Sequence, residues 1–511
     1  MANWTDGYVA EIDYTHGYYV ELNPLRVQLA LLASGLVPPA IETACELGFG
    51  QGMSVNLLAA AGAVQWCGTD FNPAHAGFAR EMAAVSGSAA RLYDEAFAEF
   101  AARSDLPDFD FIALHGIWSW ISDANRAVIV EFVRRRLKVG GVLYVSYNTQ
   151  PGWAQMLPMR HLLAEHAAEL GAQGGSILQR VDAALEFAER LLATNPLYSR
   201  VNPLVGERLQ QMKTQDRHYL AHEYFNRDWA PMPFARMAEW LEPAKLTHAG
   251  SAHFLDHVDL VNLSGDQQAL LASLPEGNFR QTVRDFMVNQ QFRRDYWVRG
   301  ARRLSALEQG ERLRATPVVL ISERAHVTYK VNGALGEAGL NEAVYAPLLE
   351  QVADHGVRTI GEIESALLAR GLNRAQVLQA VFVLLGKGDL APAQSPHPQH
   401  PCRASAARLN AWALNKARGS VEISYLASPV TGGGVPVNRI QQLFLLALQQ
   451  GRQDPAGLAD SVWQVLSSQN QRLLRDGRAL ANEADNLAEL QAQATAFLER
   501  RLPLLRSLQV C

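Results

Sequence analysis

The chain has 511 residues, of which 48% are hydrophobic and 19% are charged, and its formal net charge is −5. This length predicts several domains, and this composition excludes an intrinsically disordered chain. The negative net charge argues against a generally basic nucleic-acid-binding protein.

Cysteine usage and the N-terminal sequence narrow the class of protein further. The four cysteines, Cys45, Cys67, Cys402 and Cys511, show no Cys-x-x-Cys spacing, so neither a metal site nor a disulfide framework is expected. The first residues lack a basic segment followed by an apolar run, and no apolar stretch reaches the ~18 residues that would span a bilayer. We therefore expect a cytoplasmic protein with no bound metal and no membrane insertion.

The first 150 residues predict a parallel sheet. After an apolar helix over Pro24–Leu36, strand and helix patterns alternate, which is typical of a sheet with helices on both faces. The expected strands are Ile41–Leu47, Val64–Thr69, Ala90–Tyr93, Phe109–Leu114 and Gly141–Tyr147. The expected helices between them are Val55–Ala61, Pro73–Ser86, Phe97–Ala102 and Ala124–Leu137. In such sheets the ligand lies beyond the carboxyl ends of the strands.

A glycine-rich turn, Glu46-Leu-Gly-Phe-Gly-Gln-Gly52, follows the first strand. Such a turn lets backbone N–H groups approach a ligand that side chains would block. The dinucleotide fingerprint Gly-x-Gly-x-x-Gly needs a third glycine where Met53 stands. Glycines at every second residue, after an acid, instead resemble motif I of class I S-adenosylmethionine (SAM) methyltransferases. The resemblance implies a role in cofactor binding for Glu46, Gly48, Phe49, Gly50 and Gly52. For Glu46, a solvated carboxylate at the start of a helix is the alternative.

Carboxylates also follow the second and third expected strands. Asp70 ends the second strand, where a carboxylate can accept both ribose hydroxyls of a nucleoside, and Phe71 joins the same cofactor site. Asp70 also suits the cap of the next helix, and the two roles are compatible. After the third strand, we expect Asp94 to bond the adenine amino group while Ala96 or Phe97 packs on the ring. Helix capping alone is the alternative for Asp94.

The fourth and fifth strand ends are expected to surround the methyl acceptor. His115 can take a proton from a substrate ammonium, and tryptophan faces attract a cationic amine by about 0.5–2 kcal/mol. The predicted catalytic residues are His115, Trp118 and Tyr147, and His115 is also expected to touch the cofactor. The predicted substrate-binding residues in this region are Trp118, Trp120, Asn148 and Trp153. Buried packing is the alternative for the tryptophans.

Several of these segments resemble one family together. The glycine turn, Asp70, residues 114–122 (LHGIWSWIS) and residues 145–153 (VSYNTQPGW) are similar to bacterial SAM methyltransferases with a methyltransferase regulatory domain. That family includes rickettsial-type protein-lysine methyltransferases that act on outer-membrane protein. Residues 219–229 resemble its regulatory segment, and residues 286–295 resemble the helix before its next domain. The resemblance implies SAM as the cofactor and a protein lysine amine as the methyl acceptor.

The predicted fold class is α/β, with four parts. Residues 1–155 form a Rossmann-like class I methyltransferase domain with an N-terminal lid, and residues 156–312 form a mostly helical regulatory domain with a strand over Leu255–Leu263. Residues 313–395 resemble a winged-helix domain. Residues 396–511 form a helical C-terminal region that begins with a linker ending at residue 401.

The partner of the winged-helix-like domain is predicted from its charge. Its third helix offers only Arg374, whereas neutralising DNA phosphates takes ~6–10 basic contacts, so we expect no nucleic acid. A protein-docking or dimerisation module is the preferred interpretation, which makes a homodimer a candidate assembly.

The N-terminal segment leaves the acceptor open. Relatives carry a Tyr-Pro pair before the first helix, whereas this chain has residues 11–19 (EIDYTHGYY). Tyr14 and Tyr18, with Tyr19, are expected to line the substrate entrance, and an aromatic edge packed on the sheet is the alternative. A small molecule or surface-glycan precursor is therefore a second candidate acceptor. A non-catalytic SAM-binding scaffold is the third hypothesis.

Overall fold

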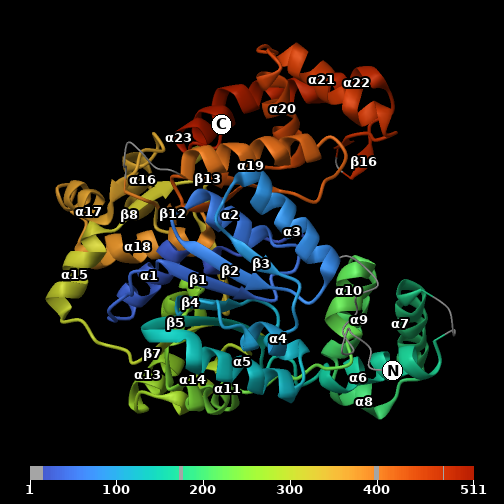
Figure 1. Cartoon of the computed structure of the whole chain (residues 1–511), viewed down its shortest axis with the longest axis vertical. Helices are drawn as coiled ribbons and strands as arrows, with labels where there is room; N and C mark the ends of the chain where they lie inside the picture. Colours follow the sequence, from blue (N-terminus) through green and yellow to red (C-terminus); the bar gives the residue numbers. More distant parts are fainter. Residues whose placement is uncertain (1–14, 172–175, 396–401, 476) are drawn as a thin grey trace.

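The structure is a computed structural model that describes residues 15–171, 176–395, 402–475 and 477–511. A twisted central sheet carries helices on both faces, and three further groups of helices surround it (Figure 1). The predicted linker up to residue 401 lies outside the described residues except for Ser395.

The sheet has the strand order β3-β2-β1-β4-β5-β7-β6. Its first five members run parallel, and β7 is antiparallel to both β5 and β6. The strands are β1 (Thr43–Leu47), β2 (Gln65–Thr69), β3 (Arg91–Tyr93), β4 (Phe109–Leu114), β5 (Leu137–Asn148), β6 (Leu246–Ser251) and β7 (Phe292–Arg299). All six residues of β4 are buried, as expected for a strand covered on both faces. The α/β class with a parallel-dominant sheet is confirmed.

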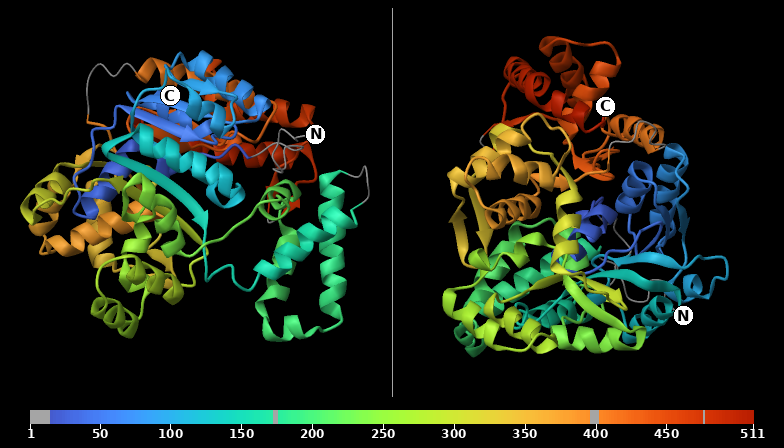
Figure 2. Two further views of the ribbon diagram at one scale, coloured as in Figure 1. Left: turned by 60° about the horizontal axis from the view of Figure 1, so that its bottom comes forward. Right: turned by 90° about the vertical axis from the view of Figure 1, so that its left-hand side faces the viewer.

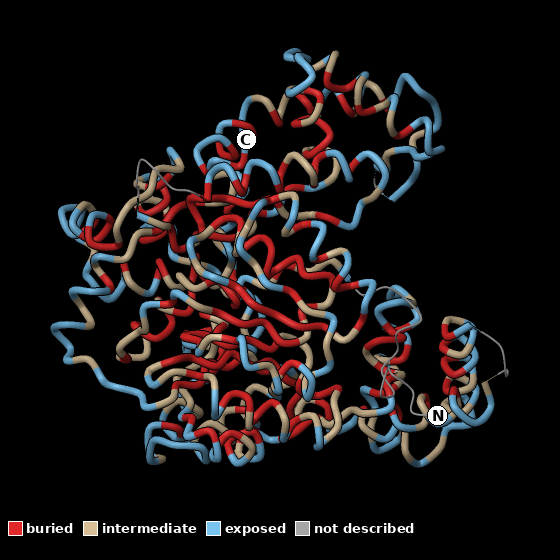
Figure 3. The backbone as a smooth tube through the Cα atoms, viewed as in Figure 1, coloured by how far each residue is buried: buried red, intermediate tan, exposed pale blue. Residues whose placement is uncertain are grey.

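Helices from the first 250 residues cover both faces of this sheet. One face carries α1 (Pro24–Ala33), α2 (Met53–Ala61) and α3 (Pro73–Ser86). The other carries α4 (Phe97–Ala102), α5 (Asp123–Arg136) and α11 (Phe234–Leu241). Local sequence sets their starts: the Asn72 side chain accepts the backbone N–H of Ala74, and Pro73 occupies the first turn of α3. Buried residues therefore concentrate along the strands and the inner helix faces (Figure 3).

The segment predicted as mostly helical supplies the last two strands of the sheet. The strand expected over Leu255–Leu263 is wrong, because these residues form η4 (Phe254–His257) and α12 (Asp259–Asn262). The Asn262 side chain donates hydrogen bonds to the carbonyls of Leu255 and Val258, which holds this turn in a helical shape. The helix expected to continue through Asp295 ends at Met287, and β7 follows it. The sheet thus extends across the domain boundary predicted at residue 155.

Five helices between the sheet strands form a separate lobe, which we call the arm. They are α6 (Leu157–Glu169), α7 (Ile177–Ala193), α8 (Leu197–Val201), α9 (Leu204–Thr214) and α10 (Arg217–Tyr224). The arm stands beside the sheet in Figure 1 and in the left view of Figure 2. It has its own apolar core, built around residues such as Val181, Leu209 and Leu220.

Residues 259–392 contain strand β7 of the central sheet together with further helices and short strands. The helices are α13 (Gly265–Ser273), α14 (Asn278–Met287), α15 (Ala306–Ala315), α16 (Glu342–Gln351), α17 (Ile360–Leu368) and α18 (Arg374–Lys387). The strands are β8 (Pro317–Leu320), β9 (Lys330–Gly333), β10 (Gly336–Gly339), β11 (Arg358–Thr359) and β12 (Leu390–Pro392). The three-stranded sheet β11-β8-β12 beside three helices has the elements that a winged-helix domain needs, and that assignment stays a prediction.

The C-terminal region packs against the methyltransferase-like domain. Its helices are α19 (Cys402–Lys416), α20 (Arg439–Gln449), α21 (Pro455–Ser468), α22 (Glu483–Ala496) and α23 (Leu502–Ser507), and its strands are β13 (Tyr425–Ser428), β14 (Gly433–Pro436), β15 (Leu474–Arg475) and β16 (Arg478–Ala479). Helix α19 contacts α2 and α3, and β13 and β14 contact α2. The remaining short helical turns are η1 (Val20–Leu22), η2 (Trp118–Trp120), η3 (Glu242–Ala244), η5 (Arg324–His326) and η6 (Phe497–Arg501).

No helix in the described ranges combines the length and the hydropathy needed to cross a bilayer. No group of three or more His, Cys, Asp or Glu side chains in these ranges is placed to hold a metal ion.

Candidate functional site

A pocket opens at the carboxyl ends of the parallel strands, where the strand order reverses between β1 and β4. This is the position at which open α/β sheets bind their ligands. Its empty volume is about 1200 Å³. The lining residues are Thr15, Gly17, Tyr19, Gly48, Phe49, Gly50, Gln51, Met53, Asp70, Phe71, His75, Glu95, Ala96, Phe97, His115, Gly116, Ile117, Trp120, Ile121, Ser122, Asn125 and Asp228.

The glycine turn between β1 and α2 forms the floor of this pocket. Gly48, Gly50 and Gly52 have φ values of 71°, 56° and 72°, which L-residues with side chains rarely adopt. A Cβ at Gly48 would lie 2.5 Å from the Ile117 side chain, and one at Gly52 would lie 2.5 Å from the Ala79 Cβ. Gly48, Phe49 and Gly50 line the pocket as predicted. Gly52 does not line the pocket. Its lack of a side chain instead allows α2 to pack closely on Ala79 of α3.

Asp70, at the end of β2, faces the glycine turn. Its Oδ2 accepts the backbone N–H of Gly50 at 2.8 Å. Its Oδ1 accepts the backbone N–H of Asn72 at 3.0 Å and lies 3.3 Å from Nδ1 of His75. The carboxylate therefore ties the turn to the start of α3 while it lines the pocket. Its neighbour Phe71 lines the pocket too.

Glu46 lies beneath the turn and not in the pocket wall. Its side chain is buried, and it accepts a hydrogen bond from the backbone of Val55, while its Oε2 has no partner among the described residues. Burial raises the pKa of Glu46 to about 8, and the nearby Asp70 charge adds to this shift. The solvated carboxylate considered from the sequence is thereby corrected, because the β1 strand end carries this side chain into the domain interior.

At the end of β3 the sequence prediction is displaced by one residue. Asp94 points to solvent and pairs with Arg80 at 2.5 Å, so it does not line the pocket. Its neighbours Glu95, Ala96 and Phe97 do line it. Successive residues of an extended chain point to opposite sides, so the carboxylate that faces inward here is Glu95. Glu95 is paired with Arg103 at 2.6 Å.

His115 is held at the end of β4 by stacking and by a hydrogen bond. The Tyr19 ring stacks on it with a centroid separation of 3.5 Å, and its Nδ1 lies 2.8 Å from the Tyr144 hydroxyl. Burial lowers the pKa of His115 to about 4, so the imidazole is neutral at physiological pH. The backbone N–H of Gly116 donates to Ser146 Oγ at 2.8 Å, which fixes the turn that follows. His115 lines the pocket, and its catalytic role and its contact with the cofactor stay predictions.

Two of the predicted catalytic residues belong to the core. Side chains alternate along β5, so Tyr144 and Ser146 face the His115 turn and Tyr147 faces the opposite side. The Tyr147 hydroxyl donates to Asp295 Oδ2 at 2.9 Å in a buried site. Trp118 is 1% exposed, and its Nε1 lies 3.4 Å from Met232 Sδ. Neither side chain lines the pocket, which corrects both predictions.

The predicted substrate-binding residues divide in the same way. Trp120 lines the pocket, as expected. Asn148 and Trp153 do not, because Asn148 is buried where β5 pairs with β7, and Trp153 packs on Tyr224 in the core of the arm. The tryptophan alternative, buried packing, therefore holds for Trp118 and Trp153.

The N-terminal tyrosines separate into two roles. Tyr14 lies outside the described residues. Tyr18 is buried against the C-terminal region and does not line the pocket, which corrects its predicted role. Tyr19 lines the pocket, as expected, so one tyrosine of this segment packs and the next faces the site.

Several lining residues were not predicted from the sequence. They are Thr15, Gly17, Gln51, Met53, His75, Glu95, Gly116, Ile117, Ile121, Ser122, Asn125 and Asp228. Asp228 lies in the segment that resembles the regulatory domain, and only the tertiary fold brings it beside Trp120 and Asn125. Residues next to the recognised strand ends, such as Ile117 and Ser122, could have been included from their position alone. Among the described residues, the pocket lining contains three carboxylates, Asp70, Glu95 and Asp228, and neither Lys nor Arg. The pocket wall is therefore acidic.

The chain is similar to known proteins along its whole length. A family model described as "Predicted methyltransferase regulatory domain" matches residues 216–299. The uncharacterized protein sll1526 from Synechocystis is 40% identical over 512 residues, which is 99% of each chain. A solved structure of PKMT2 from Rickettsia typhi in complex with AdoHcy superposes with a TM-score of 0.68 at 16% identity, and it covers 97% of this chain and 99% of that one. A second structure of PKMT2 from the same organism gives a TM-score of 0.65 at 17% identity over 94% and 98% of the two chains.

Proposed function

Because this chain belongs to the family of class I methyltransferases with a methyltransferase regulatory domain, together with the Synechocystis protein, we propose that it is a SAM-dependent methyltransferase acting on lysine amines of a protein. One observation carries the proposal. The glycine turn, the Asp70 carboxylate and the His115 turn converge on one pocket at the reversal point of the sheet.

The described residues fit the parts of SAM. Asp70 Oδ2 accepts one N–H bond from the protein, which leaves an acceptor site for a ribose hydroxyl. Ala96 and Phe97 supply apolar contact for the adenine, and the backbone of residues 48–50 would hold the amino-acid part. Glu46 Oε2 is buried and unpartnered beneath the glycine turn, so its carboxylate would act on a bound ammonium group through its charge and not as part of the pocket wall. SAM, when bound, supplies an electrophilic methyl group for in-line displacement.

The far end of the pocket suits an amine acceptor. Asp228 gives this end a carboxylate, and the Trp120 indole offers a face for a cation. Because the pKa of His115 is about 4, a proton taken from an ammonium would not remain on this imidazole at neutral pH. We therefore assign His115 to alignment of the acceptor and the cofactor, with Tyr19 and Tyr144 fixing its ring. Alignment is the main requirement of methyl transfer.

A small-molecule acceptor is the second candidate. Tyr19 lies over His115, and the N-terminal residues Thr15, Gly17 and Tyr19 together form part of the pocket wall. This wall favours an acceptor smaller than a folded protein surface, such as a small molecule or a surface-glycan precursor. A SAM-binding scaffold without turnover would retain the pocket and yield no product.

The test combines binding with product analysis. We expect calorimetry to show micromolar binding of SAM and none of NAD. Incubation with SAM carrying an isotopically labelled methyl group and a fractionated cell extract should then label lysine side chains, identified by mass spectrometry. Asp228→Asn should lower this labelling and leave SAM affinity unchanged, whereas the control Asp182→Asn, on the exposed surface of the arm, should change neither. Preferential NAD binding would overturn the cofactor assignment, and label confined to small molecules would support the second acceptor.

A further inference from the structure

Two adjacent tyrosines connect the pocket to the C-terminal region. Tyr19 is extended, with φ −109° and ψ 106°, so neighbouring side chains point to opposite sides of the chain here. The Tyr19 ring stacks on His115 inside the pocket. The Tyr18 ring turns the other way and packs against the hairpin formed by β13 and β14, residues 425–436, which we call the C-terminal hairpin.

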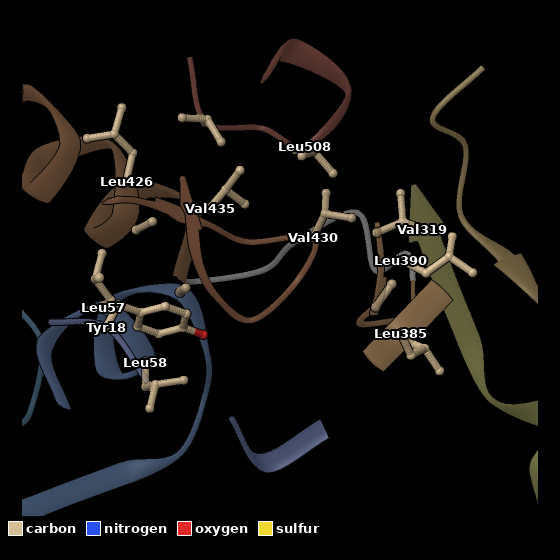
Figure 4. Close-up of a cluster of buried hydrophobic side chains, with 14 of the residues drawn as sticks. Tyr18, Leu57, Leu58, Val319, Leu385, Leu390, Leu426, Val430, Val435 and Leu508 are labelled. Carbon is tan, nitrogen blue, oxygen red and sulfur yellow. The ribbon is translucent and has the colours of Figure 1, made fainter. Parts of the chain in front are cut away.

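The C-terminal hairpin and its neighbours hold Tyr18 in place through polar and apolar contacts. The backbone N–H of Gly434 and the side chain of Asn23 donate hydrogen bonds to the Tyr18 hydroxyl. Asn23 Nδ2 also donates to the carbonyl of Thr431 at 2.9 Å, so the segment before α1 is bound to the hairpin at a second point. The Tyr18 ring lies beside Leu57 of α2, and both side chains contact the hairpin at Gly434 (Figure 4).

Two glycines of the hairpin make room for this ring. A Cβ at Gly433 would overlap the Tyr18 hydroxyl and would lie 2.9 Å from Asn23 Nδ2. A Cβ at Gly434 would lie 3.1 Å from both the Tyr18 ring and the Leu57 side chain. A side chain at Gly433 would therefore displace Tyr18, whereas one at Gly434 would crowd it more mildly.

Tyr18 is linked to the pocket by the peptide unit that joins it to Tyr19, because Tyr19 lines the pocket. The Tyr19 backbone N–H donates to Ser54 Oγ of α2 at 2.9 Å, so this unit is fixed between the hairpin and the methyltransferase-like domain. Tyr18 and Tyr19 share this peptide unit, so a shift of the Tyr18 backbone would also move the backbone from which the Tyr19 ring projects over His115.

We propose that the C-terminal hairpin is a positioning element of the cofactor pocket: it holds Tyr18, and Tyr18 places Tyr19 over His115. Tyr18 is thus a positioning residue, and the C-terminal region contributes to cofactor affinity although it supplies no pocket-lining residue among those described. The link to SAM rests on the function proposed above. The link to His115 does not, because it concerns the protein alone.

The experiment uses the full chain with Gly433→Ala, Tyr18→Phe and the double variant. Gly433→Ala should raise the Kd for SAM by about twofold to twelvefold, which corresponds to the roughly 0.5–1.5 kcal/mol that loss of an aromatic contact costs. It should also raise the pKa of His115 from about 4 toward 6.5, because the ring loses its cover. Titration of the His115 ring protons by NMR measures this shift without SAM. The double variant should bind SAM more tightly than Gly433→Ala alone, since the closest contact of the new methyl group, the Tyr18 hydroxyl, is gone and only the contact with Asn23 Nδ2 at 2.9 Å remains.

Controls separate positioning from loss of stability. Gly419→Ala places a methyl group 4.0 Å from its nearest neighbour and should change nothing. Leu458→Ala opens a cavity in the C-terminal core and should lower the melting temperature while leaving the pKa of His115 at about 4. If Gly433→Ala does not fold, Gly434→Ala gives the milder displacement. An unchanged His115 pKa in a folded hairpin variant would overturn the inference. Absence of SAM binding in the unsubstituted protein would instead overturn the proposed function.

Discussion

Replacing Asp70 by alanine should weaken SAM binding by an amount that its contacts limit. A carboxylate offers about four acceptor sites. Oδ1 already faces the Asn72 N–H and His75, and Oδ2 accepts the Gly50 N–H, so one site is left toward the pocket. One charge-assisted hydrogen bond is worth about 1.5–3 kcal/mol, which corresponds to roughly a 10- to 150-fold rise in Kd. Two such bonds to the ribose would give about 10²–10⁴-fold, and the structure favours the smaller effect.

Calorimetric titration with SAM measures this loss, and circular dichroism with a thermal melt verifies that the variant is folded. Asp94→Ala is the matched control, because Asp94 is also an aspartate at a strand end but pairs with Arg80 at the surface. We expect Asp94→Ala to leave the Kd unchanged. A folded Asp70→Ala protein with unaltered affinity would refute the reasoning, and so would an equal loss in both variants.

Three further predictions concern buried ionisable and polar groups. The pKa of His115 is about 4 in the folded protein and about 6.5 when exposed, so the stability that the neutral imidazole gives the fold is fully present above pH ~6.5 and is lost as the pH falls toward 4. Urea unfolding should therefore show about 2 kcal/mol less stability at pH ~5 than at pH ~7.5. His115→Phe should remove this difference. The pKa of Glu46 is raised from 4.5 to about 8, so its negative charge increasingly opposes folding as the pH rises from 4.5 to 8. Glu46→Gln should therefore stabilise the protein without SAM by up to about 4 kcal/mol at pH ~8. The same variant should weaken SAM binding in the calorimetric titration. Tyr147→Phe leaves the buried Asp295 with one hydrogen bond fewer and should cost about 1–3 kcal/mol of unfolding free energy, and a SAM affinity changed as much as in Asp70→Ala would contradict its place in the core.

The five parallel strands of the sheet could be predicted from sequence because short, mostly apolar segments alternate there with helical patterns and are bounded by clear turns. Phe109–Leu114 is buried at every position and was predicted to its ends. β6 and β7 lacked this signal: Leu246–Ser251 carries Thr, His, Gly and Ser, and Phe292–Arg299 carries three arginines and an aspartate. Two of these charged residues, Arg293 and Asp295, are buried in a network in which Arg293 bonds both Asp285 and Asp295, and only the tertiary structure shows the pairing.

The site was predictable where the backbone itself makes it, and less so where side-chain direction decides. Gly48, Gly50 and Asp70 follow from a turn that the sequence displays. Trp118 and Tyr147 failed because a position near a strand end does not reveal which face of the sheet a side chain takes. The prediction for Asp94 was wrong by one residue, because neighbouring side chains point to opposite sides: Asp94 faces solvent and Glu95 lines the pocket.

The long-range pairing of β5 with β7 has a consequence for synthesis on the ribosome. Tyr147 and its partner Asp295 are 148 positions apart, and the arm and the rest of the matched segment lie between them. At about 5–20 residues per second, β5 waits roughly 7–30 s for the strand that covers its edge. A finished, apolar edge strand without a neighbour invites pairing with other chains. The nascent protein thus passes through an aggregation-prone interval, during which the arm, whose core comes from residues 153–229, is free to fold first.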